Sequence, residues 1–182
     1  FEKEPEELAD FLQSGEFSGL NVTIPYKKAV IPYLHSLSPV AKRLGAVNTI
    51  VRRTDGTLIG HNTDYFGFYT MLSQSGIQVA SKKALVLGSG GASNTAVAVL
   101  EELGAKEILT VYYKENPETI TYEECYKNHS DAEIIVNTTP VGMYPKADDC
   151  PIDLDRFPHL SGVADVVYNP LRTQLIIEAE KR

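Results

Sequence analysis

The hydrophobic positions in the first 77 residues predict short helices that alternate with short strands. Leu8, Phe11 and Leu12 recur at helical spacing, so they fall on one face of an amphipathic helix. Asp55-Gly56 between two apolar runs is a strong signal for the turn of a β-hairpin. The predicted elements are a helix over 2–14, a strand over 20–24, helices over 27–37 and 39–44, strands over 46–52 and 58–61, and a helix over 64–75.

From residue 78 the pattern changes, because continuous apolar runs now alternate with helical stretches. The predicted elements are a strand over 83–87, a helix over 95–103, and strands over 107–112, 134–137 and 162–167. Alternation of this kind is typical of a doubly wound parallel sheet. The sequence therefore predicts an α/β fold with two domains, a smaller one over residues 1–77 and a doubly wound one over residues 78–182.

A glycine-rich turn follows the first strand of the second domain and opens the next helix. Gly88 lets the chain reverse sharply, and Gly90 has no Cβ that would obstruct a pyrophosphate. The helix after the turn offers unpaired N–H groups and a partial positive charge to an anion. The third position of the fingerprint, which usually holds Gly or Ala, is Ser93, so an ordinary turn is the alternative. The stretch predicts a Rossmann dinucleotide-binding site at Gly88, Ser89, Gly90, Gly91, Ala92 and Ser93.

Composition and charge argue against several classes of function. The chain has 182 residues, 43% of them hydrophobic, which is enough for one large or two small domains with a core. A net charge of −7 disfavours a nucleic-acid partner, and no apolar run approaches the ~20 residues of a membrane helix. Cys125, Cys150 and the four histidines match no metal-ligand spacing, so we expect no metal site and a reducing, cytoplasmic setting.

Two polar clusters in the first domain can carry chemistry. Residues 21–27 place Asn, Thr and Lys27 around a strand end, and residues 60–64 place Asn, Thr and Asp64 at the start of a helix. A lysine and an aspartate brought together from two loops can hold a hydroxyl group and move its proton. The alternative is a surface lysine with Asp64 as the N-cap of the helix, and Asp64 can serve in both ways.

Six motifs between residues 21 and 173 resemble the shikimate dehydrogenase family, and they occur in the family's order. They are Asn21-Val22-Thr23-Ile24-Pro25-Tyr26-Lys27, Gly45-Ala46-Val47-Asn48-Thr49, Asn62-Thr63-Asp64-x-x-Gly67, Gly88-Ser89-Gly90-Gly91-Ala92-Ser93, Asn137-Thr138-Thr139-Pro140-x-Gly142-Met143 and Asp165-Val166-Val167-Tyr168-Asn169-Pro170-Leu171-x-Thr173. The resemblance implies reversible, NADP-linked oxidation of shikimate to 3-dehydroshikimate, a step in aromatic amino-acid biosynthesis.

The resemblance also implies roles for individual residues in the substrate site. Lys27 matches the family's catalytic lysine and Asp64 its partner, while Thr23, Asn48 and Tyr168 match positions that contact the substrate. A small polyol is best discriminated by a site full of hydrogen-bonding groups, which the wrong substrate leaves unpaired. The alternatives are that Thr23 and Asn48 only fix loops, and that Tyr168 is a core residue with a hydrated hydroxyl.

For the cofactor, the resemblance places Thr138 and Thr139 beside the dinucleotide and Val166 against the nicotinamide. The alternative is that the two threonines are only turn residues after a strand. A basic residue at the end of the second strand favours the 2′-phosphate of NADP, whereas an acidic residue selects NAD. The family often has Asn-Arg-Thr there, but this chain has Tyr112-Tyr113-Lys114-Glu115-Asn116. Lys114 can pair with a phosphate as a point charge and Glu115 acts against it, so we expect NADP, with NAD as the alternative cofactor.

Two features of the chain depart from the family pattern. The stretch His35-Ser36-Leu37-Ser38-Pro39 resembles the family's amino-terminal serine motif, whose serines hold the substrate carboxylate, but it occurs at the wrong place in the order. We therefore assign Ser36 and Ser38 no function and expect the true motif upstream of Phe1. The chain begins without methionine and ends in an apparent helix, so we expect a substrate domain without its first strands and a dinucleotide-binding domain without its final helices.

Two other functions fit the same residues. The first is a quinate/shikimate dehydrogenase that uses NAD or NADP, and the second is a non-catalytic module that only binds a nucleotide. For the favoured function we expect shikimate as the small-molecule partner, a monomer or homodimer, and neither nucleic acid nor membrane as a partner.

Overall fold

The computed structural model describes residues 3–23 and 25–182, which fold as two compact units that divide between Gly67 and Phe68. The units divide inside helix α4 (Thr63–Gln74), ahead of the boundary at 77–78 that the sequence predicts. The change of sequence pattern follows Gly76, which has a positive φ of 81° and ends the helix. That change marks the end of α4, and the helix itself begins in one unit and finishes in the other.

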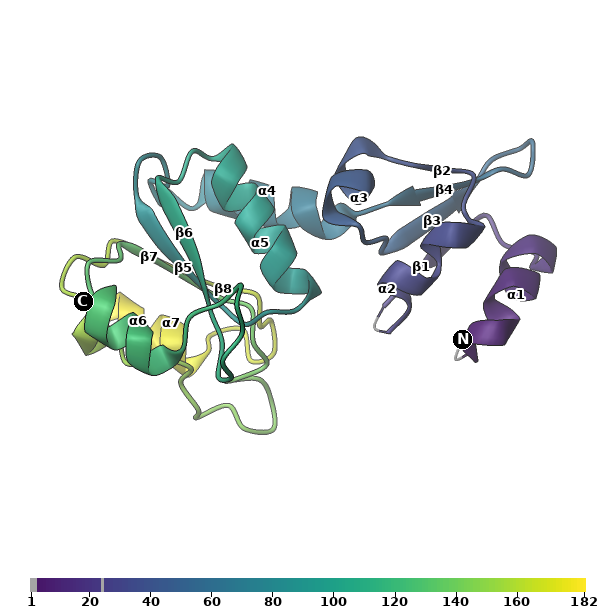
Figure 1. The fold of residues 1–182 in the computed structure, drawn as a ribbon. Coiled ribbons are helices and arrows are strands. Elements are labelled where there is room, and N and C mark those ends of the chain that lie inside the picture. The colour runs from purple at the N-terminus through teal and green to yellow at the C-terminus, as the bar shows by residue number, and fades with distance from the viewer. Residues whose placement is uncertain (1–2, 24) are drawn as a thin grey trace. The chain divides into compact units, whose positions relative to one another are not determined.

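The first unit is built on a four-stranded sheet with the order β1-β3-β4-β2 (Figure 1). Strand β3 is antiparallel to both β1 and β4, whereas β2 runs parallel to β4. The strands are β1 (Gly19–Asn21), β2 (Ser36–Leu37), β3 (Thr49–Arg52) and β4 (Leu58–His61). The helices are η1 (Pro5–Glu7), α1 (Leu8–Ser14), α2 (Tyr26–Ala29), η2 (Ile31–Tyr33) and α3 (Pro39–Leu44).

Several predicted elements of this unit are confirmed by local hydrogen bonds. The Asp55 carboxylate accepts from the backbone N–H and the hydroxyl of Thr57, which closes the predicted hairpin between β3 and β4. Helix α3 begins where predicted, and the Ser38 hydroxyl accepts from the N–H of Ala41 at 3.2 Å as its N-cap. Ser38 therefore has a structural use as the cap of α3.

The predicted helix over 27–37 is wrong in its second half. Helix α2 ends at Ala29, a 3-10 turn with Pro32 follows, and the chain then becomes strand β2. Ser36 and Leu37 lie beside β4, so long-range strand pairing overrides the local helical spacing. The predicted strand over 20–24 is β1 at 19–21, and Ile24 lies outside the described residues.

The second unit contains four strands that are all parallel, in the order β6-β5-β7-β8, which confirms the doubly wound sheet. Its elements are β5 (Lys83–Leu87), α5 (Gly91–Glu102), β6 (Glu107–Val111), α6 (Tyr122–Asn128), β7 (Ile134–Asn137), η3 (Leu154–Arg156), β8 (Gly162–Asp165) and α7 (Gln174–Glu180). Helix α5 begins at Gly91, earlier than the predicted Thr95, because the glycine-rich turn itself opens the helix.

Helices cover both faces of this sheet. Leu85 and Leu87 belong to a buried cluster with Cys125 of α6 and Leu175 of α7. Figure 1 shows α5 on the opposite face of the sheet from α6 and α7. Strand β5 lies between β6 and β7, so the order of connection reverses beside it, and the carboxyl ends of these strands are where doubly wound sheets bind ligands.

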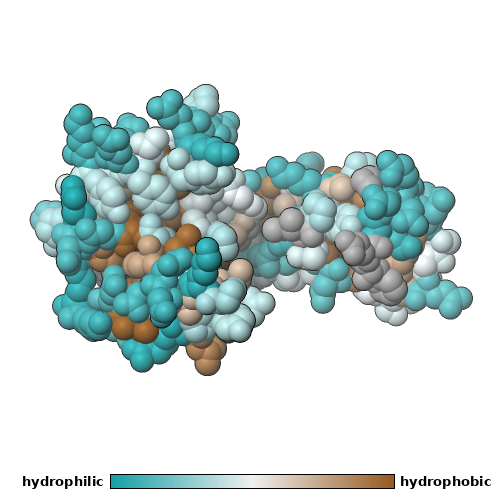
Figure 2. All heavy atoms as spheres, turned by 90° about the horizontal axis from the view of Figure 1, so that it is seen from below, coloured by the Kyte–Doolittle hydropathy of each residue, from teal (hydrophilic) through white to brown (hydrophobic). Residues whose placement is uncertain are grey.

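The surface seen in Figure 2 is mostly hydrophilic, with apolar side chains gathered on the unit of residues 68–182. The exposed large apolar residues of that unit include Met143, Tyr144 and Leu171. Within the described ranges 3–23 and 25–182, the helices are too short or too polar to cross a membrane.

Gly60 in β4 is a position where the packing of the first unit admits no side chain. A Cβ there would lie 2.6–2.8 Å from methyl groups of Leu34, Leu37 and Val47. We expect Gly60→Ala to destabilise the first unit by roughly 1–3 kcal/mol, because overpacking displaces these three side chains. Urea unfolding followed by circular dichroism measures the change.

Gly67→Ala is the matched control, since a Cβ at this helical position meets no described atom within 4 Å. Alanine is the better helix former by about 0.5–1 kcal/mol, so this variant should unfold at equal or higher urea concentration than the wild type. Wild-type stability of Gly60→Ala would contradict the packing of β4 described above.

Candidate active site

Lys27 and Asp64 form a short hydrogen-bonded ion pair in the first unit. Lys27 lies in α2 and Asp64 is the second residue of α4, and the distance between Lys27 Nζ and Asp64 Oδ2 is 2.6 Å. The side chains remain 29% and 49% exposed, so a ligand in solution can reach both groups. A cation and a carboxylate at this distance can hold an alcohol between them and take up its proton.

Asn62 explains why the Asp64 carboxylate is available to Lys27. The Asn62 side chain is 2% exposed, and its Oδ1 accepts from the N–H of Tyr65 at 3.3 Å, which is the N-cap contact of α4. Its Nδ2 donates to the carbonyl of Ala46 at 3.2 Å. The alternative that Asp64 caps the helix is therefore wrong, since Asn62 occupies that position. An asparagine directly before a helix is itself a capping signal, and the sequence analysis missed it.

Asn48 joins the start of β3 to the start of α4. Its Oδ1 accepts from the N–H of Thr63 at 2.8 Å, and its Nδ2 donates to the Thr63 hydroxyl at 2.9 Å. The Asn48 side chain thus fixes the loop that carries Asp64, as the structural alternative expected, and its contact with substrate stays a prediction. The sequence analysis did not single out Thr63, whose hydroxyl and N–H both bond to Asn48.

Thr23 lies at the turn that leads into α2. Its carbonyl accepts from the N–H of Tyr26 at 2.8 Å, and its exposed side chain borders a cavity of about 170 Å³ that Asn21 and Tyr26 also line. The backbone N–H of Val47 donates to the carbonyl of Lys27 at 2.8 Å. This bond fixes α2 against the segment that leads to Asn48. Backbone contacts therefore set the position from which the Lys27 side chain extends.

The glycine-rich turn borders a cavity of about 800 Å³ in the second unit. The cavity is lined by residues 88–90, 111–113, 122, 138–141 and 150–151, and so lies at the carboxyl ends of β5, β6 and β7. Gly88 has a φ of +106°, and a Cβ there would lie 2.9 Å from Thr138 Oγ1. Thr138 Oγ1 in turn donates to the carbonyl of Leu87 at 2.6 Å. Glycine is therefore required at position 88 by both conformation and space.

The start of α5 has the features of an anion site. Ser89, Gly90, Gly91 and Ala92 are exposed, and Gly90 precedes the helix without a side-chain cap, so the first N–H groups of this 12-residue helix remain available. Ser93 is only 2% exposed and belongs to the packed side of the helix. A pyrophosphate fits this turn, with the backbone of residues 89–92 as the donor set.

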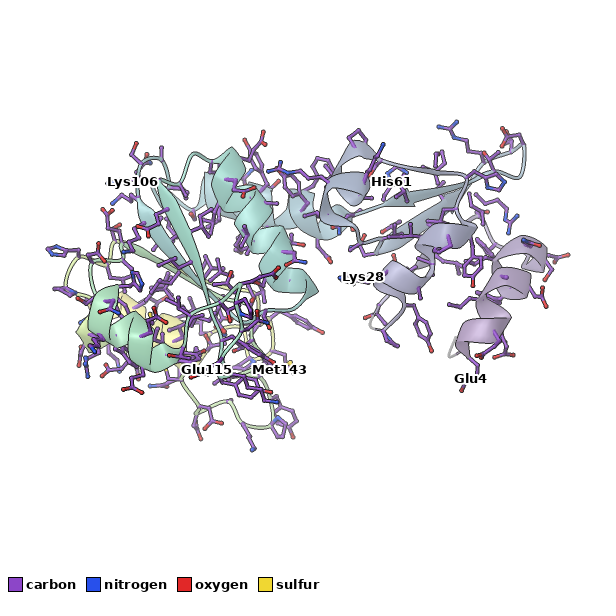
Figure 3. All side chains as sticks on the ribbon, viewed as in Figure 1. Glu4, Lys28, His61, Lys106, Glu115 and Met143 are labelled. Atoms are coloured by element: carbon purple, nitrogen blue, oxygen red, sulfur yellow. The ribbon has the colours of Figure 1, made fainter. Side chains whose placement is uncertain are left out.

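The residues after β6 form an aromatic and basic group at the cavity. The rings of Tyr112 and Tyr113 have centroids 4.5 Å apart, and Lys114 Nζ lies 5.1 Å from the centroid of the Tyr113 ring. The hydrogen bond between the two hydroxyls raises the pKa of Tyr112 and lowers that of Tyr113, which the Lys114 charge lowers further. Figure 3 shows Glu115 and Lys106 at opposite ends of β6, so Lys114 and Glu115 are on the side of the cavity.

Other predicted residues and groups of the second unit have these environments. Tyr168 and Val166 are 82% and 36% exposed on the loop after β8, so the alternative that Tyr168 is a core residue is wrong.

Burial raises the pKa of both Cys125 and Cys150 to about 11, so these free thiols stay protonated at neutral pH. The described part of the chain contains no cluster of His, Cys, Asp and Glu that could hold a metal ion.

Three comparisons place the chain among known proteins. A family model described as the shikimate dehydrogenase substrate binding domain matches residues 1–50. A Clostridium beijerinckii protein named shikimate dehydrogenase (NADP(+)) is 41% identical over 188 residues, which cover 97% of this chain and 68% of that protein.

Solved structures agree with these matches. A crystal structure of shikimate 5-dehydrogenase from Thermus thermophilus, in complex with NADP(H) and shikimate, aligns with a TM-score of 0.79 at 32% identity. That alignment covers 97% of this chain and 68% of the solved one. Quinate dehydrogenase from Corynebacterium glutamicum, in complex with NAD, aligns with a TM-score of 0.84 at 28% identity over 99% of this chain and 69% of that chain. With a relative this similar over two thirds of its length, and with the ordered motifs now located on the fold, the chain belongs to the shikimate dehydrogenase family.

Proposed function

We propose that this chain supplies the reactive groups of an NADP-dependent shikimate dehydrogenase, which oxidises shikimate reversibly to 3-dehydroshikimate. The observation that carries the proposal is the hydrogen bond of 2.6 Å between Lys27 and Asp64, two residues that the family motifs mark and that the fold brings together. Relatives with this activity in their names support it, as does the cavity at the glycine-rich turn.

Lys27 and Asp64 act together on the hydroxyl group that is oxidised. The glycine-rich turn at residues 88–93 would hold oxidised NADP, which would supply the hydride acceptor for the alcohol carbon. The hydroxyl hydrogen-bonds to the Lys27–Asp64 pair, which orients it and receives its proton as the carbon–oxygen bond becomes a carbonyl. In the reverse direction the pair returns that proton. Asp64 Oδ2 accepts from Lys27 Nζ throughout, so the amine stays directed at the reacting oxygen.

The remaining hydroxyls of the substrate need further polar contacts. We assign these contacts to Thr23 and Asn48 in the first unit and to Tyr168 in the second, because all three present polar groups at the surface or beside the ion pair. Asn48 is held by Thr63, so it offers a substrate fixed rather than mobile groups. Such preorganised donors and acceptors reject analogues that lack the matching hydroxyl.

The cofactor is held by backbone and side-chain groups of the second unit. We assign the pyrophosphate to Gly88, Ser89, Gly90, Gly91, Ala92 and the start of α5, with Ser93 as the packed third position of the fingerprint. Thr138 forms the floor beside Gly88, Val166 contacts the nicotinamide half, and Lys114 meets the 2′-phosphate of NADP. On this basis the first unit binds substrate and the second binds the dinucleotide. The free thiols fit the reducing cytoplasm that the sequence predicts.

Two alternatives are separated by simple measurements. A quinate dehydrogenase that uses NAD would oxidise quinate with NAD faster than shikimate with NADP, and Glu115 beside Lys114 is the feature that favours it. A non-catalytic nucleotide-binding module would bind the dinucleotide without turnover. The close approach of Lys27 and Asp64 argues against such a module, because nucleotide binding alone does not need this pair.

Lys27→Ala in the full-length protein should lower the turnover number by about a thousandfold, because the alcohol loses one member of the pair that orients it and takes up its proton. Affinity for NADPH, measured by the change of its fluorescence on titration, should stay within about twofold, since Lys27 does not line the dinucleotide cavity.

Lys28→Ala is the matched control, as Lys28 is the next residue of the same helix and is exposed on the first unit (Figure 3). This variant should retain wild-type turnover. Near-normal turnover in Lys27→Ala would refute the role assigned to the ion pair, whatever the control does.

Lys114→Ala should raise the dissociation constant for NADPH by about tenfold and leave that for NADH unchanged, because only NADPH carries the 2′-phosphate. Lys106→Ala, at the other end of β6, should alter neither constant. Isothermal titration calorimetry with both cofactors measures the difference. Equal effects of Lys114→Ala on the two cofactors would show that Lys114 does not read the phosphate.

A further inference from the structure

A half-buried carboxylate that the proposed reaction does not use lies at the carboxyl end of β8. Asp165 Oδ1 accepts from Asn137 Nδ2 at 3.0 Å and from the N–H of Val167 at 2.9 Å, and its Oδ2 accepts from the Thr173 hydroxyl at 2.7 Å. Burial raises the pKa of Asp165, and these three donors act against that effect by stabilising the carboxylate. A half-buried acid with three fixed partners connects segments of the chain rather than meeting solvent.

Asn137 connects this carboxylate to the wall of the dinucleotide cavity. The Asn137 side chain is fully buried, and its Oδ1 accepts from the N–H of Thr139 at 3.0 Å and from the Thr139 hydroxyl at 2.7 Å. Its Nδ2 also donates to the carbonyl of Val141 at 3.3 Å. Residues 138–141 are the four consecutive residues of this turn that line the cavity. The Asn137 amide therefore shapes that wall, and Asp165 fixes the amide.

Thr173 ties the same carboxylate to α7. Its hydroxyl oxygen accepts from the N–H of Ile176 as the N-cap of the helix, while its hydrogen is donated to Asp165. Thr173 is 1% exposed, so this bond does not compete with water. The backbone N–H of Val166 donates to the carbonyl of Asn137 at 3.1 Å, which draws the loop after β8 into the same group.

The position of this group in the sheet indicates which half of the cofactor it serves. A dinucleotide lies across the point where the strand order reverses, with its pyrophosphate at the glycine-rich turn and its adenosine half at the end of the second strand. In this sheet those places are the ends of β5 and β6. The ends of β7 and β8, where Asn137 and Asp165 lie, are on the nicotinamide side.

We propose that Asp165 is a positioning residue for cofactor binding, whose carboxylate holds Asn137 and Thr173 so that the wall of residues 138–141 keeps the shape that receives the nicotinamide half. This inference rests on the proposed function, because it takes the cavity to be the dinucleotide site. It assigns a role to three polar residues that touch neither substrate nor the reacting atoms.

Asp165→Asn tests the carboxylate with almost no change of shape. In this variant the amide oxygen can still accept from Asn137 and Val167. In the wild type the Thr173 hydroxyl donates to Asp165, whereas in the variant it would face an NH2 group, which cannot accept. We expect the dissociation constant for NADPH to rise about tenfold, while that for 2′,5′-ADP, the adenosine half alone, stays within about twofold. A merely structural role would change both ligands together or neither.

Thr173 provides a second, independent variant pair. Thr173→Val removes the hydroxyl with little change in side-chain size, and it should raise the dissociation constant for NADPH as Asp165→Asn does. Thr173→Ser keeps the hydroxyl and should bind NADPH like the wild type. If Asp165→Asn fails to fold in a thermal melt, the difference between these two variants decides the question by the same criterion.

Asp153→Asn is the matched control. The Asp153 carboxylate accepts from the N–H of Asp155 at 3.0 Å, the same two-residue contact that Asp165 makes with Val167, but it is exposed and does not line the dinucleotide cavity. This variant should leave both dissociation constants unchanged.

The outcomes separate this inference from the proposed function. Wild-type protein that binds neither NADPH nor NADH would overturn the proposed function and this inference with it. Wild-type protein that binds NADPH, together with folded Asp165→Asn and Thr173→Val proteins that bind it equally well, would overturn this inference alone. An equal loss of affinity for NADPH and for 2′,5′-ADP would also overturn this inference, since the effect would then not be local to the nicotinamide side.

Discussion

The hydrogen bond between Lys27 and Asp64 is the contact on which the proposed chemistry depends, yet it cannot hold the two helices in place. Both side chains are partly exposed, and such pairs contribute at most about 1 kcal/mol to stability. The backbone around them does the positioning. Val47 donates to the carbonyl of Lys27, and Asn48 holds the start of α4 through Thr63. Because the sheet and its loops place the two groups, the pair itself remains available to a ligand.

In the second unit the corresponding constraint is the burial of a parallel sheet on both faces. Strands β5 and β7 are buried along almost their whole length, so polar groups can reach a ligand only where the strands end. The first residues beyond those ends supply the cavity. Gly88 and Thr138 occupy neighbouring positions there, and the threonine hydroxyl fills the space in which a Cβ at position 88 would lie. The fingerprint glycine is thus required by its neighbour as well as by a ligand.

Elements marked by a local sequence signal, such as a turn, a helix cap or a continuous apolar run, could be predicted from the sequence. The hairpin at Asp55, helix α3 after Ser38 and strands β5 and β7 depend on local signals and were located correctly. Strand β2 could not be predicted, because two residues become a strand only through pairing with β4. The same limit applies to the site. Motifs marked Lys27 and Asp64, but the cap at Asn62 depends on where α4 begins, and the bonds of Asp165 join residues up to 28 positions apart.

Asp64 and Asp165 show that the same type of side chain can have different roles, depending on its exposure and hydrogen-bond partners. Both belong to family motifs, so the sequence pattern marks them equally. An ionised carboxylate has about four sites for hydrogen-bond donors. Asp64 is about half exposed and accepts a hydrogen bond from Lys27, so sites remain for a substrate hydroxyl. Asp165 is half-buried and accepts from three donors, on Asn137, Val167 and Thr173. A carboxylate that takes part in proton movement must keep open sites, whereas one that fixes a wall must have them filled, and only the folded chain distinguishes the two.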